Sequence, residues 1–246
     1  MLNCLRFGRF DRARRFAWLA GLLLAAPLLV AAGNDSAAAP DPDPQRFADA
    51  IKGFERWDAK NAWPQDPVLF VGSSSIVMWQ THDAFPDWPV VNRGFGGSHI
   101  SDVNHYFDKV VTPYHARVIL FYCGDNDIAG GKSPQQVLED YAEFARHVHE
   151  VAPEAHLVYL PIKPSTSRWK LWPQMKETNE LIKAHIAKDP LQSYLDLTTP
   201  MLDPDGNPRP ELLRDDGLHM NADGYAIWNE AVRAHVGKLL TRQGGH

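Results

Sequence analysis

The stretch "LFVGSSSIVMW", Leu69 to Trp79, is the starting point for the fold. An apolar run ends there in a glycine and three serines, and apolar residues then resume. A short apolar run of this kind predicts a buried β-strand. Glycine and serine are common turn residues, so the stretch fits a polar turn. A serine at the end of a strand can equally be a nucleophile. Taken alone, the stretch favours the turn.

Similar apolar runs recur along the chain and alternate with amphipathic segments. The expected strands are 68–71, 89–92, 117–123, 156–162 and 191–197. Helical periodicity is found at about 99–109, 134–152, 170–188 and 221–241. Ser133 and Pro134 favour a helix start, with the serine as N-cap and the proline in the first turn. The alternation predicts an α/β fold, in which right-handed crossovers connect the strands of a parallel sheet.

The amino-terminal residues differ in composition from the rest of the chain. Five arginines precede an apolar run at 16–32, which ends in the small-residue sequence "VAA". This is the pattern of a secretory signal peptide. We therefore expect residues 1–32 to be removed on export, 33–43 to be a linker and 44–246 to form a single domain. An uncleaved membrane anchor is the alternative, but the apolar run is short for a span and contains Pro27.

Composition and charge exclude some classes of function. The chain has 246 residues, of which 44% are hydrophobic and 22% charged, as in ordinary globular proteins. Without residues 1–32, the 25 basic and 30 acidic residues become 20 and 29, a formal charge of −9. Nucleic acid is therefore not an expected partner. Cys4 lies in the expected signal peptide, so Cys123 would have no disulfide partner.

Polar segments lie where a ligand site is expected. In open α/β sheets, ligands bind beyond the carboxyl ends of the strands. Four polar segments follow apolar runs or precede the last expected helix: Gly72–Ser75, Asn92–Val103, Tyr122–Gly131 and Arg214–Tyr225. Each alone also fits a turn or a helix cap. Taken together, they predict a functional site at the carboxyl edge of the sheet.

In their order, the four segments resemble the sequence blocks of the SGNH (GDSL-type) hydrolases. The layout is also similar to the platelet-activating-factor acetylhydrolase-like and lysophospholipase-like esterases of that family. The resemblance covers about residues 65–240. It implies a three-layer α/β/α, flavodoxin-like fold with a five-stranded parallel sheet. The site residues that it implies are Ser74, Asp216 and His219 as catalytic residues, and Ser74, Gly97 and Asn126 as the oxyanion hole.

The chemistry of these residue types agrees with the resemblance. A serine hydroxyl needs a base to accept its proton, and histidine can do this near neutral pH. An aspartate three residues before the histidine can hold its other ring nitrogen. Asp215 is adjacent, but the Asp-x-x-His spacing favours Asp216. A glycine N–H and an asparagine amide supply neutral donors for an oxyanion. Ser73 stands where the family has an aspartate, which leaves the choice among the three adjacent serines open.

The function expected from these residues is that of an exported carboxylic-ester hydrolase working through an acyl-enzyme. No cofactor is expected. A metal site is not expected either, because the eleven histidines include no His-Glu-x-x-His motif and there is no cysteine cluster. The expected substrates are lysophospholipids or short-chain acyl esters. Alternatives are a carbohydrate acetyl esterase, an acyltransferase, or a non-catalytic carbohydrate-binding protein on the same scaffold.

One further segment, "PSTSRWKLWP", Pro164 to Pro173, follows the fourth expected strand. Its Arg168 and Trp169 either shape the substrate pocket or belong to a packed surface loop. The sequence does not indicate an oligomeric state.

Overall fold

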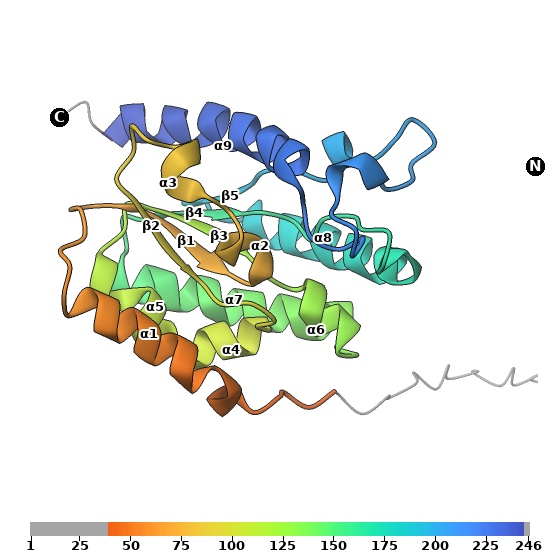
Figure 1. Cartoon of the computed structure of the whole chain (residues 1–246). Helices are drawn as coiled ribbons and strands as arrows, with labels where there is room; N and C mark the ends of the chain where they lie inside the picture. Colours follow the sequence, from red (N-terminus) through yellow and green to blue (C-terminus); the bar gives the residue numbers. More distant parts are fainter. Residues whose placement is uncertain (1–38, 244–246) are drawn as a thin grey trace, which may run out of the picture. The chain divides into compact units, whose positions relative to one another are not determined.

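The structure, a computed structural model, describes residues 39–243, and its centre is a parallel β-sheet (Figure 1). The strands are β1 (Val68–Gly72), β2 (Val90–Gly94), β3 (Val118–Tyr122), β4 (His156–Tyr159) and β5 (Gln192–Tyr194). They are arranged in the order β2-β1-β3-β4-β5, and every neighbouring pair is parallel. This is the flavodoxin-like strand order. The predicted α/β fold with a five-stranded parallel sheet is confirmed.

The alternation of side chains along β1 explains the three layers. Leu69 and Val71 belong to one apolar core and Val68 and Phe70 to the other. The helices on the first face are α1 (Ala48–Asp58), α4 (Ile100–His105), α5 (Phe107–Val110), α7 (Pro134–Val151) and α8 (Trp172–Ile186). The second face is covered by α3 (Thr81–Ala84) and α9 (Ala222–Gln243), above the sheet in Figure 1. Strands buried on both faces read as continuous apolar runs, which is the pattern seen in the sequence.

The longer helices agree with the predicted periodicity to within a few residues. Ser133 caps α7 as expected: its hydroxyl accepts the N–H of Gln136, whose side chain accepts the N–H of Ser133. The prediction of a single helix at 99–109 is wrong, because two helices, α4 and α5, are separated at Tyr106 (φ −99°, ψ 16°). The Tyr106 hydroxyl donates to the carbonyl oxygen of Pro44 at 3.1 Å. This tertiary contact accompanies the break, and periodicity alone does not reveal it.

Residues 39–47 pack against later parts of the chain. Asp41 pairs with Lys132 at 2.5 Å, and Arg46 pairs with the buried Asp102 at 2.5 Å. The expected signal peptide, residues 1–32, lies outside the described residues and stays a prediction, as does the division into linker and domain. Between residues 39 and 243, no helix is both long and apolar enough to cross a membrane.

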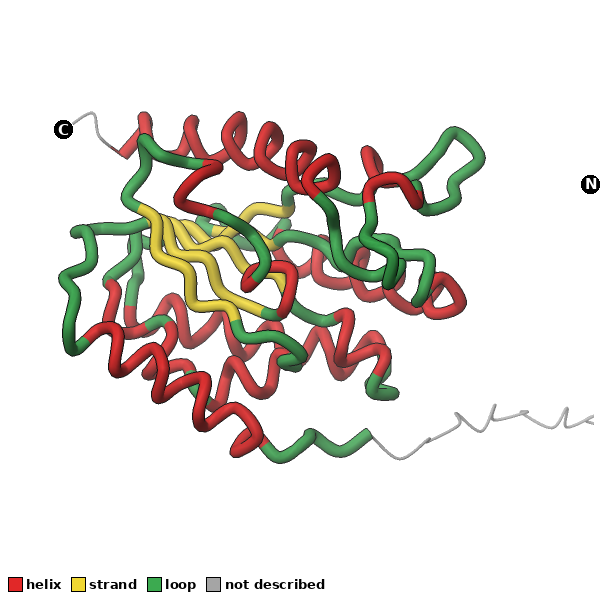
Figure 2. Tube along the Cα trace, in the orientation of Figure 1, coloured by secondary structure: helices red, strands yellow, loops and turns green. Residues whose placement is uncertain are grey.

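The strand register brings the predicted site segments together. Gly72, the last residue of β1, is paired with Gly94 of β2 on one side and with Tyr122 of β3 on the other. The three strands therefore end at the same level, and the loops that follow them leave from the same end of the sheet (Figure 2). This edge carries the serines, the Gly96-Gly97 segment and Asn126.

Candidate active site

Ser74 begins the short helix α2 (Ser74–Val77), directly after β1. Its neighbours Ser73 and Ser75 are buried, with exposed fractions of 0% and 2%, whereas Ser74 is partly exposed. The first N–H groups of a helix have no carbonyl partner within the helix. The turn thus presents the Ser74 hydroxyl and a backbone N–H at the carboxyl edge of the sheet.

Ser74, His219 and Asp216 form a continuous chain of hydrogen bonds. His219 Nε2 lies 3.0 Å from Ser74 Oγ, and His219 Nδ1 lies 2.6 Å from Asp216 Oδ2. A carboxylate only accepts hydrogen bonds, so the Nδ1–H donates to Asp216 and Nε2 is left to accept from the serine hydroxyl. The aspartate that contacts the histidine is Asp216, as the spacing predicts, and the neighbouring Asp215 is exposed.

The Asp216 carboxylate also accepts backbone hydrogen bonds from its own turn. The N–H groups of Leu218 and His219 donate to Oδ1 at 2.8 Å and 2.9 Å. The hydrogen bond from the His219 side chain, followed by these two backbone bonds, lowers the pKa of Asp216 well below its usual range. The group that orients His219 is therefore held as a carboxylate.

The turn that carries Asp216 and His219 depends on Gly217. This residue has φ +62°, a left-handed conformation that favours glycine. Its carbonyl oxygen accepts from the Thr166 hydroxyl at 3.1 Å and from the Ser167 N–H at 3.0 Å. The connection between β4 and α8 therefore packs directly on the turn that carries Asp216 and His219. A β-carbon at position 217 would lie 2.3 Å from Thr166 Oγ1.

The glycines after β2 lie beside the serine turn. A β-carbon placed on Gly96 would be 3.6 Å from the Ser74 β-carbon, so the Gly96 backbone lies next to Ser74. Gly97 has φ +84°, and a β-carbon placed there would meet no atom within 4 Å. Its backbone conformation, rather than crowding, favours glycine at this position.

Asn126 lies in α6 (Asp125–Ala129), which directly follows β3. Its amide nitrogen donates to the carbonyl oxygen of Ser98 at 3.1 Å, and its amide oxygen accepts from Arg168 Nη2 at 2.9 Å. The structure thus brings Ser74, the Gly96-Gly97 segment and Asn126 to one edge of the sheet. It also links Asn126 to Arg168, a contact that sequence reasoning missed.

A second missed residue supports the loop after Gly97. The buried Asp127, next to Asn126, accepts the N–H of Ile100 at 3.0 Å. Burial raises the pKa of Asp127 to about 7, and the ammonium group of Lys132, 3.4 Å away, acts in the opposite direction. The only sequence signal for this hydrogen bond is that acidic residues flank Asn126 on both sides. Acidic residues are also common in turns, so the signal is not specific.

Lys163 is the third residue that the sequence interpretation passed over. It follows β4 in the apolar stretch "VYLPIKP", and its side chain is buried. Its ammonium group donates to the carbonyl oxygen of Leu218 at 2.6 Å. A lysine at the end of a buried apolar run is the signal that could have singled it out.

Trp169 and Trp172 stack on each other, with ring centroids 5.7 Å apart and an angle of 17° between the ring planes. Both side chains are partly exposed. Trp169 is adjacent to Arg168, which contacts Asn126, so the stacked pair lies in the segment that borders the site.

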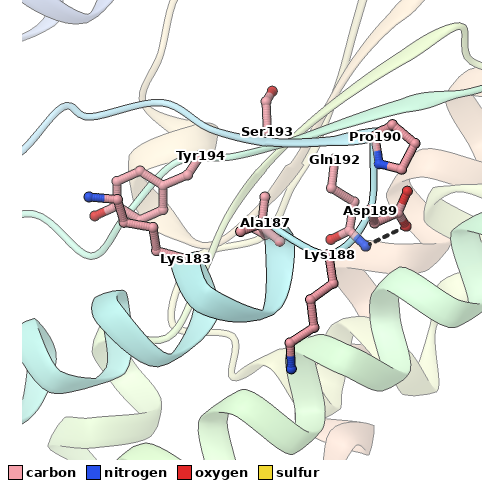
Figure 3. Close-up of a pocket in the computed structure, with 9 residues that line it drawn as sticks. Lys183, Ala187, Lys188, Asp189, Pro190, Gln192, Ser193 and Tyr194 are labelled. Carbon is pink, nitrogen blue, oxygen red and sulfur yellow. Dashed lines mark hydrogen bonds between the residues drawn. The ribbon is translucent and has the colours of Figure 1, made fainter.

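The pocket in Figure 3 is a separate feature. It includes β5 and is lined by nine residues between positions 183 and 194. The ammonium group of Lys183, one of them, lies 5.4 Å from the centre of the Tyr194 ring. None of the predicted site residues lines it. Within the described part of the chain, no group of three or more His, Cys, Asp or Glu side chains is arranged to hold a metal ion.

Comparisons with known proteins agree with the fold and identify a family. The GDSL-like lipase/acylhydrolase family matches residues 74–227. The bovine platelet-activating factor acetylhydrolase IB subunit alpha1 is 24% identical over 210 residues, which are 79% of this chain and 88% of that protein. A GDSL-like lipase from Bacteroides thetaiotaomicron has a similar structure, with a TM-score of 0.64, 20% identity and coverage of 80% of this chain and 98% of the other.

An acetylxylan esterase from Geobacillus stearothermophilus, solved as a catalytic mutant, is similar with a TM-score of 0.58 and 13% identity. The similarity covers 72% of this chain and 96% of that one. At this level of identity, the solved structures establish the shared fold.

Proposed function

Because this chain belongs to the GDSL-like lipase/acylhydrolase family and is an ester-bond hydrolase, we propose that Ser74 is its nucleophile, with His219 as base and Asp216 as its orienting carboxylate. The single observation that carries the proposal is the hydrogen-bond chain from Ser74 through His219 to Asp216, with distances of 3.0 Å and 2.6 Å. Residues 74 and 219 are far apart in sequence, and this geometry is the one that serine activation requires.

The reaction proceeds in two half-reactions. Ser74 Oγ attacks the ester carbonyl carbon while its proton passes to His219 Nε2. The tetrahedral intermediate collapses, His219 returns the proton to the leaving alcohol, and an acyl-enzyme remains on Ser74. A water molecule then attacks the acyl carbonyl carbon while His219 accepts its proton. The second tetrahedral intermediate collapses, His219 returns the proton to Ser74 Oγ, and the acid is released. Asp216 keeps its charge throughout and stabilises the imidazolium.

The negative charge that develops on the carbonyl oxygen needs donors that are already in place. We assign this role to the backbone N–H groups of Ser74 and Gly97 and to the side-chain amide of Asn126. One N–H of that amide is used by Ser98. An asparagine amide has two N–H donors, so the other is available to the substrate oxygen.

We propose lysophospholipids or short-chain acyl esters as the substrates. The similarity to an acetylhydrolase subunit over most of the chain supports a short acyl group. A carbohydrate acetyl ester is the second candidate, because Trp169 and Trp172 form a partly exposed aromatic stack beside the site. Aromatic rings are suited to packing against the apolar faces of sugar rings.

The test is a substrate panel on the purified protein. It contains p-nitrophenyl esters of increasing acyl length, acetylated xylo-oligosaccharides and lysophosphatidylcholine, each measured with wild type and Ser74→Ala. We expect turnover that Ser74→Ala abolishes. The highest kcat/KM for the shortest acyl chains would identify a short-chain esterase, and the highest kcat/KM for lysophosphatidylcholine would identify a lysophospholipase. Transfer of the acyl group to an added alcohol, in preference to water, would instead identify an acyltransferase. Absence of turnover on the whole panel, together with tight binding of oligosaccharide, would favour the non-catalytic alternative.

We also propose that the protein is exported to the periplasm or secreted after cleavage near residue 32. The arginine-rich segment and the apolar run at 16–32 support this. Amino-terminal sequencing of protein recovered from outside the cytoplasm should begin between Gly33 and Ala39. Recovery of only the full-length chain in the membrane fraction would contradict cleavage.

A further inference from the structure

Arg168 connects to both of the first two residues of α6. It lies in the connection between β4 and α8, just before the short 3₁₀ helix η3 (Trp169–Leu171). Its Nη2 donates to Asn126 Oδ1 at 2.9 Å, and its Nη1 lies 3.0 Å from Asp125 Oδ2. The Arg168 side chain is 20% exposed, and that of Asp125 is 6% exposed. The guanidinium group is therefore largely enclosed between its two partners.

The two partners of the Asn126 amide define its orientation. A guanidinium group only donates hydrogen bonds, and a backbone carbonyl only accepts them. The amide oxygen must therefore face Arg168, and the amide nitrogen must face Ser98. Rotating the amide by 180° would place two donors against each other at Arg168 and two acceptors against each other at Ser98.

This orientation has a direct chemical consequence. With the nitrogen on the Ser98 side, the second amide N–H is free to donate to a substrate oxygen. With the amide reversed, an oxygen would stand where negative charge develops, and it would repel the transition state. The Ser98 contact alone is a single neutral hydrogen bond, whereas the Arg168 contact is charge-assisted and hence the stronger of the two.

We propose that Arg168 is a positioning residue that holds the Asn126 amide in its catalytically competent orientation. This inference rests on the proposed function, because it assumes that Asn126 stabilises the oxyanion. In this proposal Arg168 orients the Asn126 amide and does not itself contact the substrate. Its two terminal nitrogens already face Asn126 and Asp125, and both of these partners belong to the protein.

The first experiment measures kcat and KM for Arg168→Ala and Arg168→Lys on a short-chain p-nitrophenyl ester. We expect Arg168→Ala to lower kcat about ten- to a hundredfold with little change in KM, a smaller loss than removal of the donor itself. Arg168→Lys keeps a positive charge beside the buried Asp125 but not the planar fork, so it should give an intermediate kcat. Arg146→Ala is the matched control, because Arg146 forms an exposed ion pair with Glu150 on α7.

The decisive comparison is a double-mutant cycle with Asn126→Ala. If Arg168 acts through Asn126, Arg168→Ala should lower kcat less than about threefold once the amide is gone. Equal losses in both backgrounds would overturn the proposal. So would a rise in KM with unchanged kcat, which indicates substrate binding. A fall in melting temperature with normal kcat per folded molecule would show that Arg168 is merely structural.

A substrate-free measurement separates this proposal from the proposed function. In ¹⁵N-labelled protein, the side-chain amide signal of Asn126 is the one missing in Asn126→Ala. Arg168→Ala and Arg168→Lys should shift or broaden that signal, and Arg146→Ala should not. An unchanged signal in both Arg168 variants would overturn the positioning role even in an active esterase. If the Arg168 variants shift the Asn126 signal but the wild-type protein has no esterase activity, the contact between Arg168 and Asn126 is supported and the proposed function is refuted.

Discussion

The ammonium nitrogen of Lys163 lies 2.6 Å from the carbonyl oxygen of Leu218. The peptide group that joins Leu218 to His219 is thereby held at both ends, because its N–H donates to Asp216 Oδ1 at 2.9 Å. The Lys163 side chain is buried, and this burial lowers the pKa of its ammonium group. A buried ammonium group is costly unless it is hydrogen-bonded, so its contact with the turn that carries Asp216 and His219 indicates that it fixes the backbone of His219.

Replacing Lys163 by methionine removes this donor and keeps a side chain of similar length. We expect Lys163→Met to lower kcat about ten- to a hundredfold, since small displacements of a catalytic base are costly in rate. The melting temperature should change little, because the variant also removes a buried charge. Lys170→Met, at an exposed position, is the control. A wild-type kcat in Lys163→Met would show that the turn keeps its conformation without the Lys163 hydrogen bond.

The identity of the nucleophile can be tested by covalent labelling. A fluorophosphonate should modify Ser74, as read by peptide mass mapping, and Ser74→Ala should lower kcat by about six orders of magnitude. Ser73→Ala should keep wild-type activity, because the Ser73 hydroxyl is buried and forms no hydrogen bond among the described residues. Label found on Ser73 or Ser75 would refute the assignment.

The Asn126 amide should act in the transition state more than in substrate binding. Charge appears on the carbonyl oxygen only as the serine attacks. We expect Asn126→Ala to lower kcat about a hundred- to a thousandfold, the usual effect of losing one such donor, with KM nearly unchanged. Asn126→Asp should lower kcat further than Asn126→Ala, because it adds negative charge where an anion forms. Measuring melting temperature and kcat on the same preparations separates this role from turn stabilisation.

The lowered pKa of Asp216 predicts a pH-dependent contribution to stability. Its hydrogen bonds favour the carboxylate in the folded state. The resulting stabilisation is fully present above the ordinary carboxyl pKa of about 4 and is lost as the pH falls toward the lower folded-state pKa.

The melting temperature of Asp216→Asn should therefore lie below that of wild type at pH 7, and the difference should shrink below about pH 4. At pH 7, kcat should fall by about four orders of magnitude, since the amide cannot hold the histidine in the same way. A melting-temperature difference that stays constant from pH 7 to pH 3 would contradict the assigned hydrogen bonds.

Gly217 and Gly206 form a matched pair for testing the catalytic turn. Both have left-handed φ angles, +62° and +82°. A β-carbon at Gly206 would meet no atom within 4 Å, whereas one at Gly217 would lie 2.3 Å from Thr166 Oγ1. Gly206→Ala should cost about 1–2 kcal/mol of stability, from backbone strain alone, and leave kcat unchanged. Gly217→Ala should cost more and also lower kcat, because the turn carries Asp216 and His219. If Gly217→Ala and Gly206→Ala had equal effects on kcat, activity would not depend on the backbone conformation of the turn at Gly217.

The sequence by itself determined the layers of the fold. Short apolar runs such as Leu69–Val71 can bury both faces of a strand, and this is sufficient to indicate a parallel sheet covered on two sides. The Ser133 cap marks the start of α7 because capping depends on residues only three positions apart. The site segments were visible for the same reason: each is a short polar stretch at the end of an apolar run.

Only the tertiary structure decided how those segments meet. It places Ser74 rather than Ser73 or Ser75 against His219, a contact across 145 positions of the chain. It also joins Lys163 to Leu218 and Arg168 to Asn126, across 55 and 42 positions. Local patterns report the periodicity of burial and the chemistry of turns. Contacts between distant loops depend on the twist of the sheet and the packing of its connections, and no short stretch of sequence contains that information.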